Sequence, residues 1–233
     1  FKSSFGFNIY NSLYKGFNFP TPENSEPSMV YSMDEDYDTR LEWTWTNTLN
    51  YVKSFGNHNI NALLGYEAID YQRKWLNAGM AGYVSTEPSA WYIQDAMGDP
   101  STKTVYSYGT LSSMTSIFAK LDYNFANRFY LSGTVRRDGS SKFGPANAYG
   151  IFPAFSAGWR LSEEGFMSNL NWLSNLRIRG GWGITGNQAI PGGRTANQYG
   201  GSTGQTFYDI TGSQSSLATG YRLTAIGNPD LKW

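Results

Sequence analysis

The chain has 233 residues, of which 17% are aromatic, only 15% are charged and 26 are glycines, a composition that favours an all-β fold over long helices. Its 18 basic and 18 acidic residues cancel, so no net charge attracts nucleic acid. The absence of cysteine excludes disulfides, thiol catalysis and thiolate metal sites, and no apolar run approaches the roughly 18 residues of a membrane helix.

Seven segments show the two-residue alternation of a strand, with one apolar row and one polar row each. The apolar rows of the first three, in chain order, are Phe5, Phe7 and Ile9; Trp43, Trp45, Leu49 and Tyr51; and Ile60, Ala62, Leu64, Tyr66 and Ala68. Two residues break the rule in this part of the chain, because Asn47 interrupts the second apolar row and Leu63 lies on the third polar row.

The four later segments follow the alternation more strictly. In residues 117–125, Lys120, Asp122 and Asn124 share one phase, and the other phase carries only aliphatic and aromatic side chains. The remaining apolar rows are Phe129, Leu131, Gly133 and Val135; Phe155, Ala157, Trp159 and Leu161; and Leu176, Ile178, Gly180, Trp182 and Ile184. Together the patterns predict seven strands with one dry face and one wet face.

The connections between these segments alternate in length. The short links cover residues 54–57, 126–128 and 162–175, and the long links cover 14–40, 77–111, 138–148 and 186–230. The third short link is interpreted as one short helix or turn, whereas the long links are rich in Gly, Ser, Thr, Asn and Pro and lack a strong period.

An antiparallel up-and-down meander with short turns on one rim and long loops on the other is typical of a bacterial outer-membrane barrel. About 10 tilted residues suffice to cross the apolar band, and most of the segments have roughly that length. A soluble all-β sandwich or barrel is the alternative, because alternation alone does not distinguish lipid from a protein core.

Several motifs occur along the second half of the chain: RRDGSSKFG at 136–144, FPAFSAGWRLSEE at 152–164, LRIRGGWGITGNQ at 176–188 and NPDLKW at 228–233. In type and order they resemble the SusC/RagA family of TonB-dependent outer-membrane transporters. The stretch WTNTLNYVKSFGNHNINALLGYEA at 45–68 is also similar to barrel strands of this family. The resemblance covers nearly all of the chain.

The resemblance implies a 22-stranded transmembrane β-barrel, of which residues 1–233 supply about a third as a partial barrel domain. A plug domain and a TonB box normally precede this region, and neither is found in the sequence, so we expect a fragment. In the family, an outer-membrane transporter imports oligosaccharides or other glycans, or peptides, together with a SusD-like surface lipoprotein. Energy comes from TonB–ExbB–ExbD acting through the N-terminal region, and no cofactor is implied.

Trp91 and Tyr92 lie in a long link between Pro88 and Pro100 and are the candidate substrate-binding residues. Exposed loop aromatics often stack on sugar rings or peptide side chains. Packing within the loop or onto a partner is the alternative.

Charged residues on polar rows are candidates for the wall of an aqueous lumen. Arg136, Arg137 and Asp138 end a strand before a Gly-Ser-Ser turn, which suggests an ion-paired strand exit, with rim or lumen electrostatics as the second interpretation. The other candidates for lumen-facing or rim charges are Arg160, Arg177 and Arg179.

An acidic cluster with DxDxD spacing, Asp34, Asp36 and Asp38, is a weak calcium candidate. It lacks the glycine at position six and the glutamate at position twelve of an EF-hand loop, so a solvated loop is favoured. Gly181 to Gly186 match GxGxxG, but the loop that follows does not begin a helix, which favours ordinary strand glycines over a dinucleotide site. His58 is the only histidine, so no His-based triad is available.

No nucleophile, base and orienting group occur together, so an enzyme is not expected. The leading hypothesis is a part of an outer-membrane importer that also contacts outer-membrane lipid. The alternative from another class is a soluble all-β carbohydrate-binding module that uses Trp91 and Tyr92. A small pore or adhesin barrel is disfavoured, because seven strands have no closing partner.

Overall fold

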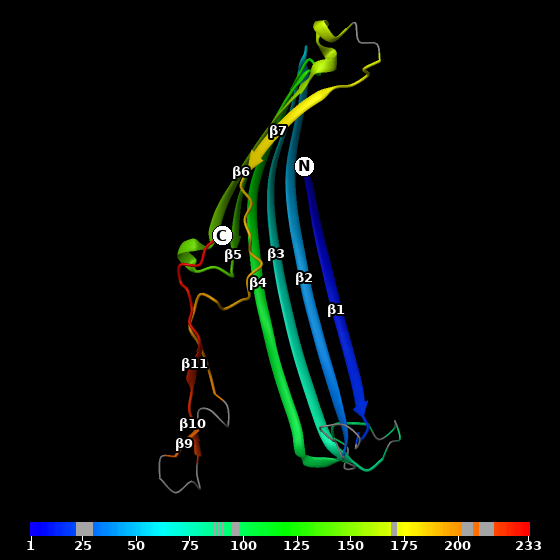
Figure 1. Ribbon diagram of the computed structural model, residues 1–233, viewed down its shortest axis with the longest axis vertical. Helices are drawn as coiled ribbons and strands as arrows, with labels where there is room; N and C mark the ends of the chain where they lie inside the picture. The colour runs from blue at the N-terminus through cyan, green and yellow to red at the C-terminus, as the bar shows by residue number, and fades with distance from the viewer. Residues whose placement is uncertain are drawn as a thin grey trace. The chain divides into compact units, whose positions relative to one another are not determined.

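The computed structural model describes residues 1–21, 30–85, 87, 89, 91–94, 98–168, 172–201, 207–209 and 217–233. Its dominant element is a seven-stranded sheet whose strands lie side by side in chain order (Figure 1). The strands are β1 (Lys2–Asn18), β2 (Tyr31–Phe55), β3 (His58–Tyr83), β4 (Asp99–Phe125), β5 (Phe129–Ser140), β6 (Tyr149–Arg160) and β7 (Arg177–Gly183). The predicted all-β meander of seven strands is confirmed.

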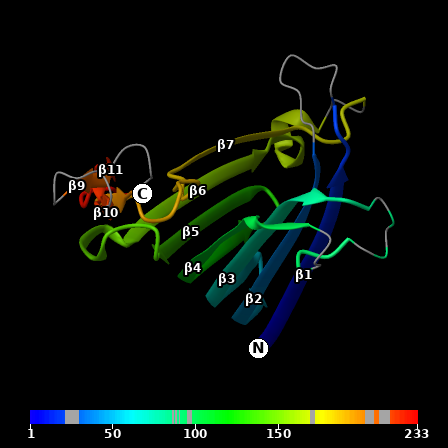
Figure 2. The same ribbon diagram turned by 90° about the horizontal axis from the view of Figure 1, so that it is seen from below.

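The chain packs as two compact units, which are described separately. The turn unit contains residues 1–4, 45–69 and 112–233, and the loop unit contains residues 5–44 and 70–111. The turn unit includes all of β5, β6 and β7 and the ends of β2, β3 and β4 next to the tight turns. A view from a second direction shows the same succession of neighbouring strands (Figure 2).

Short turns connect β2 to β3 and β4 to β5, through two residues in the first case and three in the second, as the short links predict. Gly56 has a φ of +54°, and Ala126 and Asn127 have φ values of +53° and +56°. The second turn is closed by the amide of Arg128, which donates to the carbonyl of Phe125 at 2.9 Å. In this second turn both central residues, Ala126 and Asn127, have positive φ. The twist of such a turn matches that of the flanking strands, so the two strands can pair up to the turn without a longer connection.

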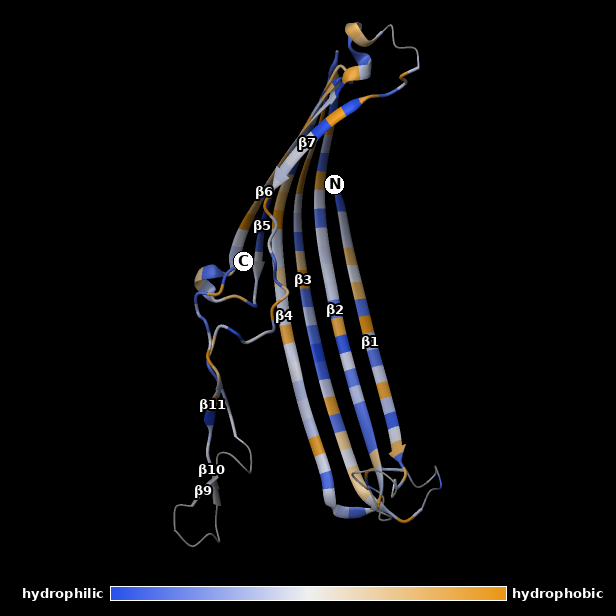
Figure 3. Ribbon diagram, in the orientation of Figure 1, coloured by the Kyte–Doolittle hydropathy of each residue, from blue (hydrophilic) through white to orange (hydrophobic). Residues whose placement is uncertain are grey.

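The antiparallel register joins the polar rows of neighbouring strands into one face and the apolar rows into the other. Asp122 of β4 lies opposite Ser132 of β5, and Ser132 lies opposite Ser156 of β6. One residue along, Leu121 lies opposite Gly133. Directly paired residues point to the same side of a sheet, so the one-residue alternation continues from strand to strand. Hydrophobic and hydrophilic bands accordingly alternate along the strands (Figure 3).

Several links that were predicted as loops are instead strand, which is the main correction to the predicted fold. β1 continues to Asn18, β2 already begins at Tyr31, β3 runs on to Tyr83, and β4 begins at Asp99. The predicted strands covered only the segments with clean alternation. The paired strands continue beyond them, because backbone hydrogen bonding does not require one apolar face.

The remaining links contain short elements. η2 (Pro145–Asn147) lies between β5 and β6, and the predicted short helix at 162–175 is represented by two 3₁₀ turns, η3 (Leu161–Glu163) and η4 (Gly165–Met167). The last long link, predicted without periodic structure, contains four short strands in two two-stranded sheets: β8 (Gln198–Gly200) with β11 (Arg222–Ala225), and β9 (Phe207–Asp209) with β10 (Leu217–Thr219).

No helix in the described part of the chain is long and apolar enough to cross a membrane.

Buried apolar side chains are few. Among the described residues, the buried hydrophobic ones are Met33, Ala68, Met80, Tyr83 and Phe143. A soluble chain of this length buries a far larger core. The alternating apolar rows therefore do not form a protein interior.

Candidate functional site

The apolar face of β4 to β7 in the turn unit is uncovered. Ile117, Leu121 and Ile178 are 58%, 52% and 60% exposed, and Leu131 and Phe155 are equally accessible. The register places these side chains next to one another across four strands. A contiguous apolar surface of this kind marks a membrane or a partner interface. The sheet thus presents its dry face outward within this chain.

Aromatic rings form a continuous belt along the tight-turn rim of this unit. Phe55 stacks on His58 at 4.9 Å, and His58 lies 4.9 Å from Phe125. The row continues through Phe129 to Trp159, with ring centroids 6.5 Å and 6.1 Å apart. Amphipathic and aromatic rings gather where a bilayer meets water.

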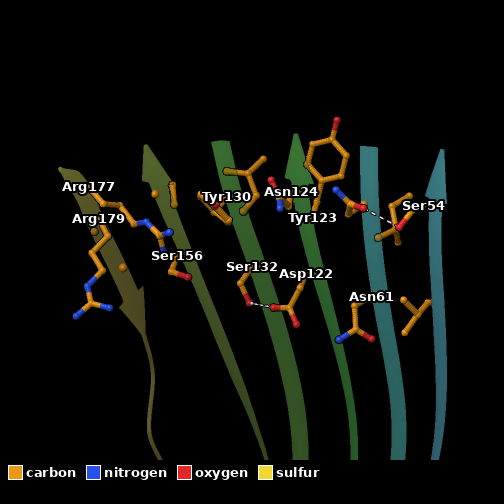
Figure 4. A pocket seen from close by; sticks show the side chains of 18 residues that line it. Ser54, Asn61, Asp122, Tyr123, Asn124, Tyr130, Ser132, Ser156, Arg177 and Arg179 are labelled. Atoms are coloured by element: carbon orange, nitrogen blue, oxygen red, sulfur yellow. Dashed lines mark hydrogen bonds between the residues drawn. The ribbon is translucent and has the colours of Figure 1, made fainter. Parts of the chain in front are cut away.

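The polar face carries a groove of about 820 Å³ that extends from β2 to β7 near the same rim (Figure 4). Its polar lining residues are Ser54, Asn59, Asn61, Asp122, Asn124, Tyr130, Ser132, Ser156, Arg177 and Arg179. Ser132 donates to Asp122 at 2.6 Å, and Lys120 lies 3.0 Å from the same carboxylate. Arg177 lies over the ring of Tyr130 at 4.4 Å. The predicted assignment of Arg177 and Arg179 to the polar phase agrees with this placement.

The two groove arginines have no carboxylate partner among the described residues, whereas Asp122 is already paired with Lys120. The groove therefore carries local positive charge, although the whole chain is neutral. A concave surface that combines apolar lining with unpaired guanidinium groups and several hydroxyl and amide groups suits a hydrogen-bonding, neutral or anionic ligand.

A second polar network lies on the same face of the sheet, further from the tight turns than the groove, and centres on Arg136. Its guanidinium donates to Glu67 at 3.0 Å, to Asp138 at 2.6 Å and to Ser116 at 2.8 Å. Thr46 donates to the other oxygen of Glu67 at 3.2 Å. Side chains from β2, β3, β4 and β5 are thereby tied together. Asp138 and Ser116 are buried, so Arg136 stabilises the wall and is less available to a ligand than the groove arginines.

Gly65 makes room for one member of this layer. A Cβ atom built at Gly65 comes within van der Waals overlap of the Phe118 ring, and Arg136 lies over that ring at 5.4 Å. The aromatic ring of β4 therefore rests on the bare backbone of β3. The glycine is required for close approach rather than for its backbone angles.

In the loop unit, an acidic residue is held by two arginines. Asp38 accepts hydrogen bonds from Arg40 at 2.6 Å and from Arg73 at 2.9 Å. These hydrogen bonds, that of Arg40 first, lower the pKa of Asp38 to about 2. Asp36 accepts from Asn77 at 2.8 Å, and Asp34 accepts from Asn18 at 3.3 Å.

These contacts correct the prediction of a solvated loop at the acidic cluster, because all three aspartates lie on strand β2. Each carboxylate already has a donor from another side chain. Within the described residues, no group of three or more His, Asp or Glu side chains is arranged to hold a metal ion.

Trp91 packs inside the loop unit. Its ring stacks on Phe17 at 4.4 Å with an interplanar angle of 6°, next to the buried cluster of Met33, Met80 and Tyr83. Tyr92 is 59% exposed, and Lys15 lies over its ring at 4.3 Å. The structure therefore separates the two predicted binding residues, since Trp91 is partly buried by its packing and Tyr92 is largely exposed.

The other predicted charges lie outside the groove. Arg160 pairs with Glu163 at 3.2 Å beside the 3₁₀ turns. Arg137 lies on the opposite face of β5 from Arg136, since it pairs with Ile117 and Ile151. The GxGxxG match falls on the end of β7 and the irregular segment after it, without a helix, so it does not form a phosphate-binding loop.

Strands with an exposed apolar row, an aromatic belt at one rim and a polar, grooved opposite face define a wall segment of the transmembrane β-barrel class. The chain is 30% identical over its whole length to TonB-dependent receptor P3 of Formosa agariphila, covering 22% of that protein. It is 35% identical over 142 residues, 61% of the chain, to TonB-dependent receptor SusC of Bacteroides thetaiotaomicron, covering 13% of that protein.

Among solved structures, one of the RagAB peptide transporter matches with a TM-score of 0.84 and 25% identity, over 99% of this chain and 24% of that chain. A structure of the RagAB peptide importer in an open-open state matches with a TM-score of 0.81. No family model matches the chain. The chain belongs to the SusC/RagA family of TonB-dependent receptors, and it spans between an eighth and a quarter of the length of the proteins it matches.

Proposed function

We propose that the protein containing this chain is an outer-membrane TonB-dependent transporter that imports oligosaccharides or peptides. Residues 1–233 form part of the β-barrel domain, with the apolar rows against lipid and the grooved face toward an aqueous lumen. The observation that carries this proposal is the exposed apolar row of β4 to β7 lying back to back with the polar groove. A soluble carbohydrate-binding module would need that row covered.

The chain provides a wall and a binding surface, and the energy for transport comes from elsewhere. The relatives of this chain are named as TonB-dependent receptors, and SusC is one of them. The similar solved structures are those of RagAB, which is named as a peptide transporter and importer. By analogy, we propose TonB–ExbB–ExbD as the energy source and a SusD-like surface lipoprotein as the partner at the long loops.

The groove favours polar oligomers as substrates. Hydroxyl groups of Ser132 and Ser156, the amide of Asn61 and the guanidinium of Arg179 line one continuous surface. Such groups match the hydroxyl groups of sugars and the amides of peptides equally well. The unpaired positive charge adds a preference for substrates that carry carboxylate or sulfate groups.

The test is uptake by cells that carry or lack the gene for the full-length protein, with labelled neutral oligosaccharides, acidic oligosaccharides and peptides of matched size. We expect gene-dependent uptake of at least one class, and its loss when TonB is deleted. Uptake that survives TonB deletion, or no gene-dependent uptake of any class, contradicts the proposal.

Arg179→Gln probes the groove in the same assay. We expect it to lower uptake of the acidic substrate several-fold at low ionic strength, and to have less effect at high salt. Lys53→Gln, which removes an exposed charge outside the groove, is the matched control and leaves uptake unchanged. Equal effects of the two substitutions would show that the groove does not contact the substrate.

A further inference from the structure

Within the turn unit, one charged side chain lies on the otherwise apolar face of β4 to β7. Arg137 is exposed and is flanked in register by Ile117 on β4 and Ile151 on β6. Along β5 it continues the row of Leu131 and Val135. A cation in this position has to be explained, because the rest of this face carries no charge.

The position of Arg137 is built by its neighbours. Its guanidinium lies 3.8 Å from the centroid of the Tyr149 ring, and the ring lies on Gly139, where a Cβ atom would overlap it. No ion pair of Arg137 occurs among the described residues, since the nearby Asp138 pairs with Arg136 on the other face. Arg137 is thus held by an aromatic ring and has no protein counter-ion.

Its depth can be worked out from the strand. Arg137 follows Phe129 of the aromatic belt by eight residues, which is about 26 Å along a strand and about 20 Å along the membrane normal at a tilt of roughly 40°. The apolar band of an outer-membrane barrel is about 25 Å tall. Arg137 therefore lies close to the opposite interface, on the long-loop side, where a cation facing lipid costs only about 0–1 kcal/mol.

We propose that Arg137 and Tyr149 bind the phosphate of a lipid headgroup in the leaflet on the long-loop side. The ring occupies one face of the guanidinium, which leaves the N–H groups at its edge free to donate to two phosphate oxygens. Arg is suited to this contact because it is planar, permanently charged and weakly hydrated. The site is separate from the groove, which lies on the other face. The inference rests on the proposed membrane placement of the apolar face.

The experiment uses the full-length receptor purified in detergent and native mass spectrometry with bis-phosphorylated lipid A as the probe. We expect Arg137→Gln to weaken lipid A binding by about tenfold or more, the size of one charge-assisted bidentate contact. Tyr149→Leu is expected to weaken it less, and Arg137→Lys to restore only part of it, because an ammonium group lacks the planar fork.

Arg194→Gln is the matched control, since it removes an exposed arginine outside both the groove and the apolar rows of β4 to β7, and it retains lipid A binding. Dephosphorylated lipid A distinguishes a phosphate contact from general lipid adhesion, and inorganic phosphate at millimolar concentration distinguishes a lipid headgroup from a free anion. Undiminished binding to Arg137→Gln, equal binding of the dephosphorylated lipid, or displacement by inorganic phosphate overturns the proposal. Because every variant is first shown to be an assembled barrel, failure here leaves the proposed transport function untouched.

Discussion

Replacing Leu121 by Arg tests whether the apolar row faces lipid. Leu121 is 52% exposed and lies four residues from Phe125 of the aromatic belt. That spacing is about 13 Å along the strand and about 10 Å along the membrane normal, near the middle of an apolar band about 25 Å tall. An arginine there costs about 2–4 kcal/mol, which lowers the equilibrium population of assembled barrel about 30- to 1,000-fold.

Two comparison variants separate the lipid from other causes. Leu131→Arg lies on the same row but only two residues from Phe129, roughly 5 Å from the belt, so its penalty should be smaller. Ser132→Arg places the same side chain one residue further on, on the polar face opposite Asp122, where it faces the groove. We expect Ser132→Arg to assemble normally.

The assay is the heat-modifiable migration of the full-length receptor in outer-membrane fractions, combined with protease accessibility of the surface loops on intact cells. The expected order of assembled protein is Ser132→Arg above Leu131→Arg above Leu121→Arg. If both leucine variants assembled like the parent, the assignment of the two faces would be wrong. If Ser132→Arg failed as severely as Leu121→Arg, the penalty would come from strand packing rather than from lipid.

Gly65→Val should destabilise the receptor by about 1–3 kcal/mol, because the new Cβ meets the rigid Phe118 ring. Gly133→Ala is the control in thermal unfolding, because a Cβ at that position meets nothing within 4 Å. Equal effects of the two substitutions would exclude the close approach of Phe118 to Gly65. Asp38→Asn should destabilise the loop unit at neutral pH, because it removes the carboxylate that binds Arg73. The pKa of Asp38 is lowered from 3.8 to about 2, so this stabilisation is complete above pH 4 and is lost as the pH falls toward 2. The difference in melting temperature between parent and variant should therefore shrink only in that acidic window, and a difference that shrinks near pH 6 would point to another group.

The seven strands of the main sheet could be predicted from the sequence, but their length and the four short strands of the last long link could not. Alternation is imposed only where one face meets lipid and the other meets water, as in residues 117–125. Further along the same strands, both faces can be polar, and Asp34, Asp36 and Asp38 of β2 then read as a loop. Contacts between the side chains of neighbouring strands continue there, such as that of Asp38 with Arg73, which spans 35 positions of sequence.

The polar phase of the groove arginines was predictable for the same reason, whereas the Arg136 network was not. The period of two assigns Arg177 and Arg179 to the polar row without any knowledge of pairing. The partner of Arg136, in contrast, is Glu67, which is 69 positions away. Only the register of β3, β4 and β5 brings them together. The glycine that admits Phe118 beneath this network is likewise recognisable only from the neighbouring strand.

Arg136 and Arg137 show how strand geometry gives two identical neighbours different roles. In the sequence, either arginine is a plausible partner for Asp138. In the strand, residues two apart share a face, so Asp138 lies with Arg136, and their contact is 2.6 Å. Arg136 is then neutralised by carboxylates on the polar face, while Arg137 remains the one uncompensated charge on the apolar rows of β4 to β7 within the turn unit. With no carboxylate within its reach on that face, the counter-ion of Arg137 has to come from outside the protein, and the phosphates of the bilayer are the anions that this face meets.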